Sequence, residues 1–338
     1  MNRKMRTMGV AALACMLLIG YLCYDLWYVQ PVLAGSQPVT VEIAPGKPLR
    51  VVARDLARQG VLPHPAGFVL LARLRGESAA MRAGEYRIQP GTTTAELLNQ
   101  FVSGHVLMHS LTIVDGWTFK QMFAAVEQDP DLLHSLQGLS PAEVMTRLGH
   151  AGQNPEGMFY PDTYNFSRGT TDVEFLQRAY QNMQRQLDAA WTARASGLPY
   201  KSSYDALIMA SVIEKETAQS AERLQIAGVF VRRLEKGMKL QSDPTVIYGL
   251  GDAYNGDITF KDLRTDTPYN SYTRYGLPPT PICMPALASI EAALHPAPGD
   301  ALYFVAKGDG THQFSATLAE QNAAVQKYQL PHHKKHKP

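Results

Sequence analysis

The segment "ALIMASVIEKETA" (206–218) is an apolar run that ends in two carboxylates, Glu214 and Glu216. If it is helical, with about 100° of rotation per residue, Glu214 shares a face with Leu207 and Ala210 while Glu216 points about 200° away. A carboxyl at the end of an apolar helix is expected to be desolvated, which favours the neutral acid. A glutamic acid that keeps its proton near neutral pH can protonate a leaving oxygen. The spacing therefore indicates Glu214 as a candidate general acid.

Two other interpretations of this segment stay open. Glu214 could be a buried structural partner of an arginine such as Arg223 or Arg232. Ser211 and Lys215, four residues apart on one helix, have the types and spacing of a serine–lysine hydrolase pair. The motifs of other chemistries, namely a P-loop, H-E-x-x-H, G-x-S-x-G and a C-x-x-C pair, do not occur in the sequence. No metal or cofactor is therefore expected.

Two later motifs carry side chains that suit a sugar. "LQSDPTVIYG" has Gln241 and Asp243 ahead of a strand-like segment, and "YNSYTRYGLPPTPI" has Asn270 and Tyr272 before an extended proline run. Aromatic faces stack on sugar rings, and amides pair with hydroxyl groups. These motifs favour a carbohydrate ligand.

The elements that must position these residues can be read from caps and periodicity. Ser202 can cap a helix from about Tyr204 to Thr217. The following elements are expected after it: a helix over 221–236 that stops at Gly237, a short helix in "PALASIEAALHP", a hairpin formed by "ALYFVAK" and "THQFS", and a last helix opened by Thr317 and Glu320. The insert "GQNPEGMFYPDTYNFSRGT" reads as a loop with an aromatic surface.

A strand–turn–helix pattern occurs three times between residues 38 and 127, around Pro45-Gly46, Pro90-Gly91 and Asp115-Gly116. Thr92, Thr93 or Thr94 can cap the helix of the second unit. The first two units, with "PAGFVLLARLRG" between them, predict a small β-α-α-β module. The fold class expected for the chain is α+β, with this module, a larger mixed α/β domain and an N-terminal apolar helix.

The N-terminal segment has the features of a membrane anchor. Met8–Tyr24 carries no charge, and seventeen residues at ~1.5 Å each make about 26 Å of helix. Leu26 to Val29 can extend it beyond Asp25, and Trp27 and Tyr28 suit the membrane interface. A cleaved signal peptide is the alternative, but its apolar region would be shorter. The basic residues Arg3, Lys4 and Arg6 predict a cytoplasmic N-terminus.

Charge and cysteine content exclude other classes. Without the basic residues of the two ends and Asp25, 26 basic and 29 acidic residues remain, a net charge of −3. No basic stripe is left to follow a phosphate backbone, so nucleic acid is not an expected partner. Cys15 and Cys23 lie in the anchor, which leaves Cys283 alone in the outer part. It reads as a small buried apolar residue, although a catalytic role is conceivable.

Five ordered motifs give the chain a close resemblance to one family. "EGMFYPDTY", "ASVIEKET", "LQSDPTVIYG", "YNSYTRYGLPPTPI" and "AALHPAPGDALYFVAKGDGTHQFS" resemble those of the endolytic murein transglycosylases, also called the YceG-like or MltG family. The resemblance covers roughly residues 38–330. One departure is Cys283, which stands where the family usually has a small residue. The family implies peptidoglycan glycan strands as substrate and Glu214, the first acid of E-K-E-T, as the catalytic residue.

The resemblance also implies an organisation and a product. It implies an anchor over 1–30 in the inner membrane, a LysM-like module over 38–107, a periplasmic catalytic domain over 108–330 and a disordered basic tail over 331–338. The product would be a 1,6-anhydro-N-acetylmuramic acid end, and a membrane peptidoglycan synthase is a family-level partner. The candidate substrate-binding residues are Glu156, Tyr160, Gln241, Asp243, Asn270 and Tyr272, of which Asp243 or Glu156 could also stabilise positive charge. A non-enzymatic wall-binding scaffold remains the alternative.

Overall fold

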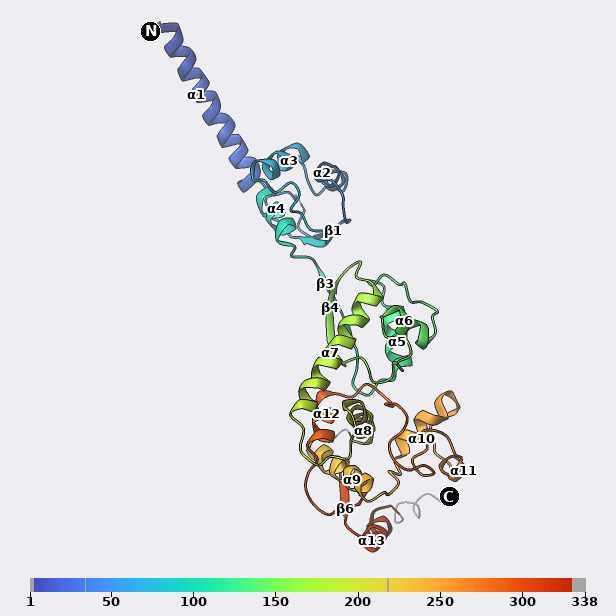
Figure 1. Ribbon diagram of the computed structural model, residues 1–338. Helices are drawn as coiled ribbons and strands as arrows, with labels where there is room; N and C mark the ends of the chain where they lie inside the picture. Colours follow the sequence, from blue (N-terminus) through green and yellow to red (C-terminus); the bar gives the residue numbers. More distant parts are fainter. Residues whose placement is uncertain (1–2, 34, 218, 330–338) are drawn as a thin grey trace, which may run out of the picture. The chain divides into compact units, whose positions relative to one another are not determined.

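The computed structural model describes residues 3–33, 35–217 and 219–329 (Figure 1). The described chain divides into two compact units. The first contains the residues up to His109 together with Asn165–Thr170, and the second contains Ser110–Tyr164 and the residues from Thr171 onward. The basic tail expected over 331–338 lies outside the described residues.

The first helix, α1 (Arg3–Tyr24), continues into a π-helical turn, η1 (Asp25–Val29). Together they contain an apolar span, Thr7–Val29, of 23 residues with a mean hydropathy of 1.9, and its most apolar window is not buried by other residues. At ~1.5 Å per residue this span is about 35 Å long, enough for a hydrocarbon layer of ~30 Å. Its length and composition are therefore compatible with single-pass anchoring.

The end of this span packs on the module that follows it. Trp27 Nε1 donates a hydrogen bond to the Gly67 carbonyl at 3.1 Å. An Arg75 amino group donates to the Tyr28 hydroxyl at 2.9 Å, and the guanidinium carbon lies 5.7 Å from the centre of the Tyr28 ring. Trp27 and Tyr28, the two aromatic residues expected at a membrane interface, thus also contact the segment that contains Gly67 and Arg75.

The first unit contains the expected β-α-α-β order, followed by one more helix. Its elements are β1 (Val39–Ile43), α2 (Leu49–Arg58), α3 (Pro65–Leu74), β2 (Gly84–Ile88) and α4 (Thr94–Ser103). β1 and β2 pair antiparallel, with Val39 opposite Ile88. Val41 and Ile43 alternate into the core, as period-2 patterning predicts, and α2 buries Leu49, Val52, Ala53 and Leu56 at helical spacing. Thr93 is the residue that caps α4, in a capping box with Glu96.

The second unit is mainly helical. Its helices are α5 (Phe119–Gln128), α6 (Pro141–Arg147), α7 (Asp172–Thr192), α8 (Ser203–Glu216), α9 (Arg223–Glu235), α10 (Asp243–Leu250), α11 (Phe260–Arg264), α12 (Leu287–Leu294) and α13 (Leu318–Tyr328), with short turns η2 (Ser220–Glu222) and η3 (Gly251–Ala253). The strands β5 (Tyr303–Ala306) and β6 (His312–Ser315) form an antiparallel hairpin. β3 (Met108–Thr112) pairs with β4 (Thr163–Ser167), and the boundary between the units falls within both strands.

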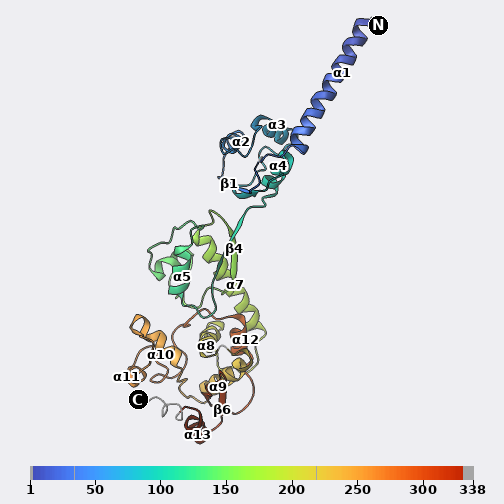
Figure 2. The same cartoon turned by 180° about the vertical axis from the view of Figure 1, so that it is seen from behind.

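Helix α8 is the centre of the second unit. It contacts α7, α9, α10 and α12, and both views place it among α9, α10 and α12 (Figures 1 and 2). Every residue from Ala206 to Ile213 is buried. An apolar helix that is covered on all sides fixes the direction of whatever follows its last buried turn.

Most of the expected elements of this unit are confirmed. α8 begins one residue before the expected start, and Ser202 Oγ accepts a hydrogen bond from the Asp205 N–H at 3.3 Å. α9 ends just before Gly237, whose φ of +61° suits a glycine. The hairpin is present, and so is the capping box of Thr317 and Glu320 that opens α13.

Two expectations are wrong. The segment after Asp243 is a helix, α10, because Asp243 and Pro244 stand in its first turn, where an acid and a proline are both favoured. The aromatic insert over 152–170 is not a loop throughout, since it contains β4. The aromatic side chains of the insert also do not form an exposed surface, because Phe159, Tyr164 and Phe166 are buried in the core.

Candidate active site

The last turn of α8 brings its polar end out of the core. Ile213 is fully buried, Glu214 is half-buried, Lys215 is exposed and Glu216 is half-buried. Thr217 then ends the helix in an extended conformation. The sheltered position expected for Glu214 is therefore only partly realised, because its side chain leaves the core at this point.

The Glu214 carboxyl is held by the start of α12. Its Oε2 accepts hydrogen bonds from the Ala286 N–H at 3.1 Å and from the Ser289 hydroxyl at 2.6 Å. Ala286 is the residue that precedes α12, so the carboxyl lies at the N-terminus of this helix and accepts one of its otherwise unpaired N–H groups. Its Oε1 accepts no hydrogen bond from any described residue. One oxygen is thus fixed and the other is free to meet a ligand.

Neither arginine considered from the sequence pairs with Glu214. Arg232 donates instead to the carbonyls of Ala297 and Ala301. Among the described residues Glu214 forms no salt bridge. The interpretation of Glu214 as one half of a buried ion pair is therefore wrong.

An acidic neighbourhood surrounds Glu214. Asp115 is exposed by surface area, but neighbouring groups partly desolvate its carboxyl and raise its pKa, and the negative charge of Glu214 raises it further. Burial, followed by the charges of Asp162, Asp115 and Glu291, raises the pKa of Tyr160. Tyr160, a predicted site residue, thus lies within electrostatic range of Asp115 and of Glu291 on α12. Asp115 was not predicted from the sequence, because its Asp-Gly pair reads as an ordinary turn.

A second polar cluster surrounds Glu216. Its Oε2 accepts a hydrogen bond from the Ser242 hydroxyl at 2.9 Å, and the Tyr272 hydroxyl donates to Asp243 Oδ1 at 2.6 Å. The negative charge of Asp243 acts on Glu216, which places the two carboxylates near one another. Gln241, Asp243 and Tyr272, all predicted site residues, are therefore brought together beside Glu216 and not beside Glu214.

Among the described residues, Gln241 is the only residue other than glycine with a positive φ, which is +52°. Its N–H donates to the Ser271 carbonyl, and its side-chain oxygen accepts from an Arg233 amino group at 3.2 Å. Arg233 also donates to the carbonyls of Lys239 and Leu240, so it stabilises this conformation from inside the fold. A strained, exposed residue that the surroundings hold in place is a common feature of functional sites.

Two predicted site residues are structural. Glu156 is 4% exposed, and its oxygens accept hydrogen bonds from the Phe119 N–H at 2.9 Å and the Tyr248 hydroxyl at 3.0 Å. Asn270 is fully buried; its amide donates to three backbone carbonyls, and its oxygen accepts from the Tyr272 N–H. Neither can reach a ligand in this conformation. Side-chain type in a motif does not reveal whether the side chain is buried.

The serine–lysine pair is contradicted by its geometry. Ser211 is fully buried, and its hydroxyl donates to the Ile208 carbonyl and accepts from the Ile282 N–H. Lys215 reaches the Gly116 carbonyl at 3.4 Å instead. Cys283 is also fully buried, its thiol donates to the Ser211 carbonyl, and burial raises its pKa well above the ordinary value. Neither the Ser211 hydroxyl nor the Cys283 thiol is placed to act as a nucleophile.

Comparison with known proteins decides the family. The model of the YceG-like family matches residues 41–327. The chain belongs to the YceG-like family. An endolytic murein transglycosylase of Bacillus subtilis (strain 168) is 31% identical over 329 residues, covering 91% of this chain and 90% of the relative.

Two more distant relatives agree with this assignment. An endolytic murein transglycosylase of Streptococcus pneumoniae (serotype 2, strain D39) is 28% identical over 323 residues; the match covers 85% of this chain but 58% of that longer protein. The crystal structure of a YceG-like protein from Listeria monocytogenes is 28% identical, with a TM-score of 0.51, and covers 86% of this chain and 99% of that one.

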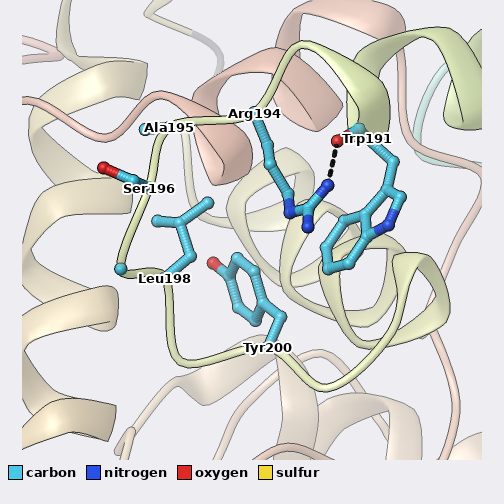
Figure 3. Close-up of a pocket in the computed structure, with 7 residues that line it drawn as sticks. Trp191, Arg194, Ala195, Ser196, Leu198 and Tyr200 are labelled. Atoms are coloured by element: carbon cyan, nitrogen blue, oxygen red, sulfur yellow. Dashed lines mark hydrogen bonds between the residues drawn. The ribbon is translucent and has the colours of Figure 1, made fainter.

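Another pocket of this YceG-like protein lies at the opposite end of α8. Figure 3 shows the loop after α7, where a pocket of about 480 Å³ is lined by Trp191, Arg194, Ala195, Ser196, Gly197, Leu198 and Tyr200. The Arg194 guanidinium stacks 4.0 Å from the centre of the Trp191 ring and donates to the Trp191 carbonyl (Figure 3). Tyr200 precedes the first residue of α8, whereas Glu214 is in its last turn, so this pocket is not part of the candidate site.

Two desolvated carboxyls besides Glu214, the buried Glu156 and the half-buried Glu216, make the stability of the protein depend on pH. Burial raises the pKa of Glu156 and the pKa of Glu216 from 4.5 to about 7. A carboxyl with a raised folded-state pKa binds its proton more tightly in the folded state. Its favourable contribution is complete below the unfolded pKa and is lost as pH rises from about 4.5 to about 7.

We therefore expect Glu156→Gln to stabilise the protein at pH 8 relative to the parent, and to lose this advantage by pH 4. A neutral amide removes the cost of ionisation and can still accept from the Phe119 N–H. The rise in the pKa of Glu156 from 4.5 to about 7 corresponds to a change of roughly 3 kcal/mol at most in the free energy of unfolding. Urea unfolding at several pH values measures the difference, with Glu235→Gln, an exposed glutamate of α9, as the control for charge. A difference that does not change with pH would contradict the prediction.

Proposed function

We propose that this YceG-like protein is a peptidoglycan lytic transglycosylase that cuts within glycan strands, with Glu214 as the catalytic acid. The two relatives named endolytic murein transglycosylases support the reaction class. The observation that carries the assignment of Glu214 is its carboxyl: two donors hold Oε2, and Oε1 accepts no hydrogen bond from the described residues. A positioned acid with one free oxygen is what protonation of a leaving group requires.

The mechanism needs only one proton donor. Glu214 protonates the oxygen that joins N-acetylmuramic acid to N-acetylglucosamine, and the bond from that oxygen to C1 of the muramic acid breaks. The C6 hydroxyl of the same sugar attacks C1, and its proton returns to the Glu214 carboxylate. The product is a 1,6-anhydro end, and no water is consumed. Glycosidases that use water need a second carboxylate as base or nucleophile, whereas here the nucleophile belongs to the substrate.

The remaining predicted residues have different proposed roles. Tyr160, within electrostatic range of Asp115, is the candidate for contact with the sugar at the cleavage point. Gln241, Asp243 and Tyr272 form the cluster beside Glu216, and we assign them to binding a neighbouring sugar of the strand. Glu156 and Asn270 support the site from within the core.

The first unit and the apolar span complete the proposal. The β1-α2-α3-β2 order and its antiparallel strand pair support a LysM-like module. A pocket of about 410 Å³ between the turn after β1 and the segment before β2 provides a concave surface on it. The basic residues before the apolar span favour a cytoplasmic N-terminus, hence a periplasmic catalytic unit on an inner-membrane anchor. A membrane peptidoglycan synthase is the proposed partner.

The decisive experiment is analysis of the products. We expect the full-length protein, purified in detergent and incubated with sacculi, to release fragments that end in 1,6-anhydro-N-acetylmuramic acid. Mass spectrometry distinguishes these ends from reducing ends, because they are lighter by one water. Reducing ends would indicate a hydrolase and overturn the proposed reaction. Binding to sacculi without any new ends would favour a non-enzymatic scaffold.

A further inference from the structure

The turn that carries Asp115 lies against the end of α8. The Trp117 N–H donates to the Val114 carbonyl at 3.2 Å, and Gly116 has a φ of +76°, which a glycine at the third position of such a turn allows. A Cβ built on Gly116 would lie 3.9 Å from Glu214 Cγ and 3.7 Å from Lys215 Cδ. A side chain at Gly116 would thus be in van der Waals contact with the proposed catalytic side chain, and the Gly116 carbonyl already accepts a hydrogen bond from Lys215.

This turn is fixed on several sides. The Ile113 N–H donates to the Asp162 carbonyl at 2.9 Å. On the other side, the Gly116 N–H donates to the Met284 carbonyl at 2.8 Å, and the Met284 N–H donates to the Trp117 carbonyl at 2.7 Å. Met284 is two residues before Ala286, which itself donates to Glu214. One short segment therefore holds both the Glu214 carboxyl and the backbone of the turn that carries Asp115.

The Asp115 side chain itself has no such support. Among the described residues it forms no hydrogen bond and no salt bridge, and the residue is exposed. It lines an open surface pocket of about 320 Å³, together with Thr112, Ile113, Val114, Pro161, Asp162 and Thr163. None of the residues that line this pocket belongs to α8, so the link between Asp115 and Glu214 is the Gly116 turn. The pocket shows that the unpaired Asp115 carboxylate, on its fixed backbone, is accessible to a ligand.

The charges around Asp115 are mostly of its own sign. Desolvation raises the pKa of Asp115 most, the charges of Glu214 and Asp162 raise it further, and Arg223 opposes them. The other ionisable groups nearby are Lys215 on α8, Tyr160, Glu291 on α12 and the buried Cys283. Like charges held together cost stability, and such costs are concentrated at functional sites.

We propose that Asp115 is a second catalytic carboxylate, whose negative charge stabilises the positive charge that develops at C1 of the muramic acid as the glycosidic bond breaks. Asp115 stays ionised throughout and forms no bond, so the proton balance remains that of Glu214 and the C6 hydroxyl. The inference rests on the proposed transglycosylase function. It also replaces the two carboxylates considered for this role from the sequence: Glu156 is buried, and Asp243 is engaged by Tyr272 in the cluster beside Glu216.

The test compares Asp115→Asn with Asp115→Glu in the full-length protein, with initial rates of 1,6-anhydro end formation on sacculi. We expect Asp115→Asn to lower kcat roughly 10²-fold with little change in KM, because fixed charges of this kind act on the transition state. Asp115→Glu should recover part of the rate. The acid limb of the pH–rate profile should disappear in Asp115→Asn, since that limb reports protonation of Asp115.

The control is Asp257→Asn, an exposed aspartate in the loop before α11 whose Oδ1 accepts from the Ile258 N–H at 2.9 Å. We expect less than a threefold loss of kcat for it. Asp115→Asn should also unfold at a slightly higher temperature than the parent at pH 8, because a repulsive charge is removed. An unchanged kcat and acid limb, equal losses in both variants, or a lower unfolding temperature would each overturn the proposed role. If the parent itself makes no 1,6-anhydro ends, the proposed function fails first, and this inference fails with it.

Discussion

Glu214→Gln is expected to lower the rate of glycan-strand cleavage by at least ~10²–10⁴-fold, the contribution of general acid catalysis. Glutamine has the shape of glutamate, and its amide oxygen can accept both the Ala286 N–H and the Ser289 hydroxyl. It has no proton that it can transfer to a leaving oxygen. Rates of 1,6-anhydro end formation from sacculi measure the loss, and an unchanged thermal unfolding curve shows that the fold is intact.

Glu216→Gln is the matched control, since both residues are half-buried glutamates in the last turn of α8. Glu216 faces Ser242 and the cluster around Asp243, away from Glu214. We expect it to lose clearly less activity, through weaker sugar binding and not through loss of an acid. Equal losses in the two variants would mean that the catalytic carboxylate is not Glu214 alone, and undiminished cleavage by Glu214→Gln would refute its role.

Gly157→Ala is expected to destabilise the protein by roughly 2–5 kcal/mol, the largest effect that we expect on folding. Gly157 has a φ of +77°, and a side chain there costs about 1–2 kcal/mol. A Cβ would also lie 2.5 Å from Pro281 Cβ and 2.7 Å from Pro281 Cγ, which a rigid ring cannot avoid. Overpacking of this kind adds about 1–3 kcal/mol. Urea unfolding of the full-length variant measures the sum.

Gly152→Ala isolates the backbone part of this cost. Gly152 has a φ of +83°, but a Cβ there would have no atom within 4 Å. It should therefore lose only about 1–2 kcal/mol. Since Ile282 and Cys283 next to Pro281 hold Ser211 of α8, Gly157→Ala should also reduce activity, whereas Gly152→Ala should not. Equal destabilisation by the two substitutions would show that contact with Pro281 does not matter.

Much of the local structure could be predicted from the sequence. Ser202, Thr93 and Thr317 begin helices as their cap signals indicate, and Gly237 follows the end of one. These signals work because a cap or an amphipathic face involves residues within a few positions of each other. The prediction was wrong for the segment after Asp243. Its apolar residues suggested a strand, but the Asp-Pro pair begins a helix.

The composition of the site could not be predicted in the same way. Residue types and motif order pointed to Glu214, Tyr160, Gln241, Asp243 and Tyr272, but could not separate the Glu214 side of α8 from the Glu216 side. The motifs also pointed to Glu156 and Asn270, but the polar atoms of these side chains form hydrogen bonds inside the fold. From sequence alone, a polar residue in a loop motif looks the same whether its side chain faces a ligand or hydrogen-bonds to the backbone.

The family, the helices with clear caps and the glutamate at the end of an apolar helix can all be predicted from the amino-acid order, because each depends on neighbouring residues or on motifs in a fixed order. Which carboxylates are neighbours depends on the folding of the whole chain. Asp115 comes beside Glu214 across almost a hundred residues, through backbone hydrogen bonds to the segment before α12. Proximity and desolvation arise from packing between distant segments, and no local pattern encodes them.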